Sequence, residues 1–166
     1  MKTIYLKGTE CHTAGNLPKV GDKAPDFNLV TPDMKDVNNN DYTGKRIVLN
    51  IFPSLDTEVC AASVRRFNQE ASKFDNTVVL CVSMDLPFAA GRFCVAEGLD
   101  NVIPASAFRS QDFPKNYGLL IADGPLAGLL ARAVVVIDNN GKIIYVNLVK
   151  EITEEPCYTD VIDILK

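Results

Sequence analysis

Residues 46–60 read Arg-Ile-Val-Leu-Asn-Ile-Phe-Pro-Ser-Leu-Asp-Thr-Glu-Val-Cys, and this stretch decides the fold. The mostly apolar residues 47–52 predict a buried strand, and Pro53 predicts a turn after it. Cys60 then stands at the start of a helix, where unpaired backbone N–H groups and a positive helix dipole favour a thiolate. Because the thiolate is the nucleophilic form of cysteine, this placement makes Cys60 a candidate for chemistry.

The helix and a second strand follow from the spacing of apolar residues. Val64, Phe67, Ala71 and Phe74 step by three and four residues, which is typical of one face of a helix. The β-branched and apolar residues 77–82 predict another buried strand. A strand, a helix and a strand in this order predict a right-handed parallel βαβ unit.

Shorter patterns divide the rest of the chain. In the first part of the chain, residue patterns predict a hairpin of residues 3–6 with a return through Cys11, a strand at 27–30 and a polar loop at 36–44. In the second part they predict a helix from Pro87 to the closing Gly98 and a short helix at 114–117. Strands at 133–137 and 142–149 follow around a turn at 139–141, and Thr153 caps a last helix. This order predicts an α/β protein with a thioredoxin-like fold, in which helices flank a central mixed sheet. We expect a single domain, residues 1–166, with residues 1–17 as an N-terminal hairpin extension.

Composition excludes several classes of function. The chain has 166 residues, a net charge of −4 and a hydrophobic fraction of 47%, as ordinary globular proteins do. No cluster of lysine and arginine predicts nucleic-acid binding. The first residues lack the apolar core of a signal peptide, and no apolar run has membrane-spanning length. We therefore expect a cytoplasmic protein that binds neither nucleic acid nor membrane.

The five cysteines do not form a known metal or disulfide pattern. Their number is odd, no Cys-x-x-Cys pair occurs, and His12 is the only histidine. A zinc site would need four ligands from scattered positions, so we expect none. Nucleotide-binding glycine motifs and the HExxH metalloprotease motif are absent as well.

The motif Pro53-x-x-x-Thr57-x-x-Cys60, at a strand-to-helix turn, resembles that of the peroxiredoxins. Residues 21–27 (Gly-Asp-Lys-Ala-Pro-Asp-Phe) resemble the entry segment of that superfamily. Three segments are very similar to the bacterial thiol peroxidase subfamily, namely residues 53–68, 92–98 (Arg-Phe-Cys-Val-Ala-Glu-Gly) and 130–138 (Leu-Ala-Arg-Ala-Val-Val-Val-Ile-Asp). The chain departs from the subfamily at Glu58, where proline is usual.

The resemblance implies a role for each of five residues. Cys60 is the peroxidatic cysteine, which attacks the peroxide and becomes a sulfenic acid. Cys94 is the resolving cysteine, which condenses with it to an intrachain disulfide. Thr57 hydrogen-bonds the thiolate and the peroxide, Pro53 shields the thiolate from water, and Arg132 stabilises the developing charge.

Plainer interpretations stand beside these roles. Cys60 and Cys94 are also compatible with cysteines packed as small hydrophobic residues. Thr57 fits a helix N-cap, and Pro53 fits a plain turn former. An arginine in the position of Arg132 is usually a solvated strand-edge residue, and sequence spacing alone does not place it near Cys60.

The function implied is a thiol peroxidase that reduces hydrogen peroxide and organic hydroperoxides, with thioredoxin as reductant and without metal or cofactor. A homodimer is implied by the same resemblance. A dithiol oxidoreductase is disfavoured because it would need Cys-x-x-Cys. A redox-sensing binding module, whose Cys60 is oxidised once and signals to a partner, remains open because sensing and turnover share their first step.

Overall fold

A computed structural model describes the whole chain, residues 1–166. The strands are β1 (Thr3–Leu6), β2 (Thr9–His12), β3 (Asn28–Val30), β4 (Asp36–Asn38), β5 (Arg46–Ile51), β6 (Thr77–Ser83), β7 (Ile103–Ser106), β8 (Ala133–Ile137) and β9 (Ile143–Leu148). The helices are the 3₁₀-helix η1 (Asn39–Tyr42) and the α-helices α1 (Glu58–Ala71), α2 (Pro87–Glu97), α3 (Asp112–Asn116) and α4 (Tyr158–Ile164).

A seven-stranded mixed sheet forms the centre of the molecule, in the order β4-β3-β7-β6-β5-β8-β9. The strands β5, β6 and β7 are parallel, whereas β8 and β9 continue the sheet antiparallel. Val48, Leu49 and Ile51 of β5 are fully buried, as expected for a strand covered on both faces. The predicted parallel β5-α1-β6 unit and the mixed sheet flanked by helices are confirmed.

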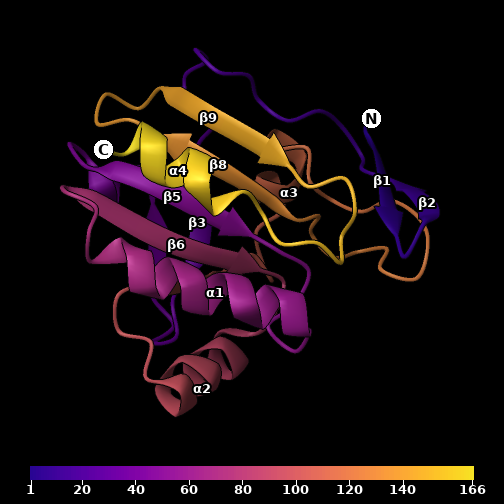
Figure 1. Cartoon of the computed structure of the whole chain (residues 1–166), viewed down its shortest axis with the longest axis horizontal. Coiled ribbons are helices and arrows are strands. Elements are labelled where there is room, and N and C mark those ends of the chain that lie inside the picture. The colour runs from indigo at the N-terminus through magenta and orange to yellow at the C-terminus, as the bar shows by residue number, and fades with distance from the viewer.

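The helices cover the sheet on both faces. α1 and α4 lie side by side over one face, and α2 lies beyond them next to β7 (Figure 1). Val64 and Phe67 of α1 pack on this face with Val161 of α4, in a buried cluster that also holds Cys60 and Cys94. A second cluster fills the opposite face, where Phe113 of α3 is fully buried.

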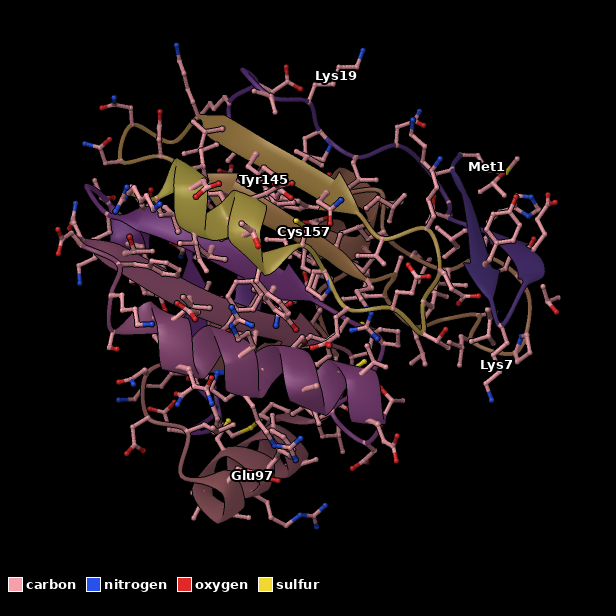
Figure 2. All side chains as sticks on the ribbon, viewed as in Figure 1. Met1, Lys7, Lys19, Glu97, Tyr145 and Cys157 are labelled. Carbon is pink, nitrogen blue, oxygen red and sulfur yellow. The ribbon has the colours of Figure 1, made fainter.

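The N-terminal hairpin β1-β2 forms a separate two-stranded sheet at one end of the molecule, with Lys7 near its tip (Figure 2). Its boundaries confirm the predicted hairpin. The hairpin is joined to the segment after β9, because the Tyr5 carbonyl accepts a bond from the Ile152 N–H at 2.8 Å. The Glu151 carboxylate accepts further bonds from the N–H groups of Lys7 and Gly8. The chain end is thus tied to a segment nearly 150 positions further along.

The prediction of a polar loop over residues 36–44 was wrong. The segment forms β4 and η1, and Asn38 caps η1 by accepting a bond from the Asn40 N–H. The strand β7 was not predicted either, because its four residues contain Pro104 and lack a repeating pattern. Both strands form because the sheet supplies hydrogen-bonding partners, which local sequence does not reveal.

The predicted start of the last helix was also wrong. α4 begins at Tyr158 with Cys157 in the N-cap position, as the place of Cys157 in Figure 2 shows. Thr153 instead hydrogen-bonds the Glu151 side chain through its N–H and its hydroxyl. Among the four α-helices, none combines the length and the hydropathy that crossing a membrane requires.

Candidate active site

The candidate nucleophile Cys60 lies in the first turn of α1. The helix begins at Glu58, so Cys60 is its third residue and follows the N-cap Thr57. The preceding strand β5 ends at Ile51, and Pro53 lies in the turn between the strand and the helix. The Cys60 side chain has 0% exposure and lies where the first N–H groups of the helix are unpaired.

The guanidinium of Arg132 contacts this sulfur directly. Its Nη2 lies 3.1 Å from Cys60 Sγ, and its Nε donates to the Ile152 carbonyl at 2.9 Å. The sheet register explains the contact, because Ala133 pairs with Ile51 at the end of β5 that leads to Cys60. Arg132, the residue before Ala133, therefore lies at the same end of these paired strands as the turn that leads to Cys60.

Arg132 is almost fully buried, with 1% exposure. The interpretation of Arg132 as a solvated strand-edge residue is therefore wrong. Its Nη1 has no hydrogen-bonding partner within the protein. A buried charged donor without a partner is costly, so this position of Nη1 needs an explanation.

A cavity of about 420 Å³ opens beside this pair. Pro53, Thr57 and Arg132 contribute to its wall, together with the apolar side chains of Leu6 and Leu126. Three of the five residues singled out by sequence therefore line one cavity, and one of them, Arg132, contacts the fully buried Cys60. A small polar head with an apolar tail matches such a lining.

The Thr57 hydroxyl is engaged by the turn before the helix and not by the sulfur. It donates to the Ser54 carbonyl at 3.0 Å, and no hydrogen bond joins it to Cys60. Thr57 holds the N-cap position with extended backbone angles, but its side chain makes no cap bond to the helix. The N-cap interpretation is therefore correct for the backbone and wrong for the hydroxyl.

Two consecutive hydrogen bonds link the Cys60 backbone to the strand β5 through Ser63 and Asn50. The Ser63 hydroxyl donates to the Cys60 carbonyl at 2.8 Å and accepts from Asn50 Nδ2 at 3.3 Å. Asn50 is a fully buried polar residue of β5, and its Oδ1 has no partner. Sequence reasoning missed both residues, although a polar side chain inside an apolar strand is a usable signal.

Cys94 lies in α2, within the same buried cluster as Cys60. All five cysteines are free thiols. Burial raises the pKa of the Cys94 thiol to about 11, and that of the neighbouring Cys81 to about 12. Both thiols are therefore protonated near neutral pH while α2 remains packed.

The glycine inside α2 has a packing role. A side chain at Gly91 would bring its Cβ within 2.9 Å of the Pro32 ring, closer than packed atoms allow. Gly91 thus lets α2 lie against the turn after β3. Gly98 ends the helix with a left-handed backbone at φ 65°, as the sequence predicted.

Neither Cys11 nor Cys157 belongs to this site. Cys11 lies in the hairpin strand β2, and Cys157 precedes α4. No group of three or more His, Cys, Asp or Glu side chains has the arrangement of a metal site.

Comparisons with known proteins show similarity over most of the chain. The Redoxin family model matches residues 19–162. The thiol peroxidase of Corynebacterium glutamicum is 53% identical over 95% of this chain and 95% of its own, and that of Mycobacterium bovis is 54% identical over 95% and 94%.

Solved structures are similar over nearly the full length. A peroxiredoxin-like protein from Aquifex aeolicus has a TM-score of 0.94 and 44% identity, with 99% of this chain and 96% of that one covered. A thiol peroxidase from Chromobacterium violaceum has a TM-score of 0.91 at 21% identity, with coverage of 98% and 94%, and it supports the thioredoxin-like fold alone.

Proposed function

The chain belongs to the Redoxin family, among its thiol peroxidases, and from this premise we propose that it reduces hydroperoxides with Cys60 and Cys94 of one chain. The observation that carries the proposal is the 3.1 Å contact between Cys60 Sγ and Arg132 Nη2 beside the cavity. A guanidinium stabilises a thiolate over a thiol, and the thiolate is the reactive form.

In the first step, the Cys60 thiolate attacks the terminal oxygen of the hydroperoxide. An S–O bond forms, the O–O bond breaks, and the leaving alkoxide or hydroxide takes up a proton. Cys60 becomes a sulfenic acid, and the peroxide is reduced to an alcohol or water. Negative charge develops on the leaving oxygen, and the unpaired Arg132 Nη1 supplies a donor next to it.

In the second step, the Cys94 sulfur attacks the Cys60 sulfenic acid. An S–S bond forms, the S–O bond breaks, and water leaves. Because Cys60 and Cys94 lie in the first turn of α1 and within α2, these segments must open before the sulfurs meet. The high pKa of the packed Cys94 thiol supports this order, since opening α2 also exposes that thiol to water.

In the third step, a dithiol protein returns two electrons and restores both thiols. We propose thioredoxin for this role, in a reducing compartment such as the cytoplasm, where dithiol proteins are maintained in reduced form. Pro53 and Thr57 line the cavity through which the peroxide approaches. We further propose, from the family resemblance, that residues 1–166 act as one domain and that the protein is a homodimer.

A coupled assay tests the proposal. Purified protein is mixed with thioredoxin, its reductase and NADPH, and NADPH consumption is followed after addition of hydrogen peroxide or an alkyl hydroperoxide. Sustained consumption over many equivalents is the expected result. A single burst of one equivalent would instead identify a redox sensor, which shares only the first step.

A further inference from the structure

The carboxylate of Asp85 lies between the two segments that carry the proposed reactive cysteines. Its Oδ1 accepts a bond from the Ser54 hydroxyl at 2.7 Å, and its Oδ2 accepts the Leu55 N–H at 2.8 Å. Ser54 and Leu55 belong to the turn that leads from Pro53 into α1 and Cys60. One carboxylate therefore holds this turn by both a side chain and the backbone.

The same residue is fixed at the start of the second segment. Asp85 stands two positions before Pro87, the first residue of α2, which carries Cys94. The Ser83 hydroxyl donates to Oδ2 at 2.7 Å, and the Ser106 hydroxyl donates to the Asp85 carbonyl. Asp85 is therefore anchored at the ends of β6 and β7 while its carboxylate reaches across to the Cys60 turn.

We propose that Asp85 is a positioning residue that couples the opening of the Cys60 turn to the opening of α2. This inference rests on the proposed disulfide between Cys60 and Cys94, for which both segments must open. Hydrogen bonds to an ionised carboxylate are stronger than those between neutral groups, so the closed arrangement is favoured while all three donors are engaged.

The other links between these segments have a different character. Arg65 of α1 pairs with Glu97 of α2 at 2.7 Å, but both side chains are more than one-third exposed. Such a surface pair is weakened by water and salt. The Asp85 bonds are partly buried, and they act at the base of α2 and not at its far end.

The closed and open forms should therefore favour different chemical steps. The closed form holds Cys60 against Arg132 and favours attack on peroxide, whereas the open form lets Cys94 reach the sulfenic acid. Loss of the Asp85 carboxylate should shift the balance toward the open form. The peroxide step should then slow, and less sulfenic acid should proceed to sulfinic acid, because Cys94 intercepts more of it.

The test uses Asp85→Asn, which keeps the shape and removes the charge and one acceptor oxygen. Hydrogen exchange of the reduced protein should rise by about tenfold in residues 53–60 and 86–98 together, and remain unchanged in β5 and β8. The rate of the Cys60 reaction with peroxide should fall, and the ratio of disulfide to sulfinic acid should rise. Ser54→Ala should shift exchange in the same direction by less, and the two changes should not be additive.

Asp138→Asn is the matched control. Asp138 is also half-buried and accepts the N–H groups of Asn140 and Lys142, each at 2.9 Å, in the turn between β8 and β9. It follows Ile137, which pairs with Ile47 at the opposite end of β5 from the Cys60 turn. This variant should leave exchange in both cysteine segments and the product ratio unchanged.

Two results would overturn the inference. One is a uniform rise of exchange through the whole sheet in Asp85→Asn, which would indicate a general structural role. The other is a rise confined to a single segment, which would mean that the two segments open independently. Failure of the unchanged protein to form the Cys60–Cys94 disulfide would refute the proposed function instead, while exchange of the reduced protein would still judge the role of Asp85.

Discussion

Arg132 Nη2 lies 3.1 Å from Cys60 Sγ, although 72 positions separate the two residues in the chain. The contact forms because β8 pairs antiparallel with β5, which brings Ala133 opposite Ile51. The Ile152 carbonyl then orients the guanidinium through Nε. A fixed positive charge and a buried sulfur are thereby combined at one edge of the sheet.

The first prediction concerns this charge. Arg132→Ala should lower kcat/KM for peroxide by an amount equal to about 2–4 kcal/mol of transition-state stabilisation, as loss of one oxyanion donor does. Alkylation of Cys60 should slow as well, because the cation no longer stabilises the reacting sulfur. Arg132→Lys is the matched comparison, since it keeps the charge and loses the planar donor fork. Unchanged peroxide kinetics in Arg132→Ala would reduce Arg132 to a structural residue.

The second prediction concerns which thiol reacts with peroxide. Cys60→Ser should abolish turnover in the coupled assay, because a hydroxyl is a far weaker nucleophile than a thiolate. Cys11→Ser, Cys81→Ser and Cys157→Ser should retain turnover, since the guanidinium of Arg132 hydrogen-bonds the sulfur of Cys60 and not theirs. Full activity in Cys60→Ser would refute the assignment of the nucleophile.

The third prediction separates attack from resolution. Cys94→Ser should still consume one equivalent of peroxide, and it should then stop as a sulfenic acid that drifts to sulfinic acid under excess peroxide. The unchanged protein should form an intrachain Cys60–Cys94 linkage, visible by peptide mapping and as a monomer of altered mobility on non-reducing gels. A dominant Cys60–Cys60 bridge between chains would overturn the role of Cys94 and leave that of Cys60 intact.

The fourth prediction concerns pH and stability. His12 Nδ1 lies 2.7 Å from the Asp123 carboxylate, and Nε2 lies 2.8 Å from that of Glu10. The hydrogen bond with Asp123, followed by that with Glu10, raises the pKa of His12 above its ordinary value of 6.5. A raised pKa in the folded state means that the His12 contribution is complete below about pH 6.5 and is lost as pH rises through the folded value.

The contribution of Asp123 to folding stability depends on pH in the opposite direction. Its pKa is lowered from 3.8 by His12, so its contribution is present above that pH and is lost as pH falls through the folded value. His12→Gln should therefore lower the urea midpoint more at about pH 5.5, below the unfolded pKa of His12, than at about pH 9, above it. Equal losses at both pH values would show that the ring acts by packing and not by charge.

The local part of this fold could be predicted from the sequence. Apolar runs and helical spacing predicted β5, α1, β6 and β8 to within a few residues, because burial on both faces leaves a clear pattern. The strand β7 and the short β4-η1 segment were missed. Their residues carry weak intrinsic preference, and they become ordered through pairing with β3 and β6.

The site likewise contains residues that local sequence predicts and residues whose position depends on strand pairing. The Cys60 turn was predicted from adjacent residues, whereas the position of Arg132 depends on which strand pairs with β5. Periodicity does not specify that pairing, so only the family resemblance led to Arg132. Asp85 gave no signal of its own, because an aspartate shortly before a proline-led helix is typical of an ordinary helix start.

The N-terminal hairpin is linked by hydrogen bonds to the segment that orients Arg132. Tyr5 bonds both Lys150 and Ile152 through its backbone, and the Ile152 carbonyl in turn orients Arg132. Trimming residues 1–12 should therefore leave the seven-stranded sheet folded but let the guanidinium swing away from Cys60. The hairpin thus contributes no reacting atom, but it helps to keep Arg132 in position. Shortened versions of the protein should therefore be judged by their reaction rate with peroxide and not by their fold alone.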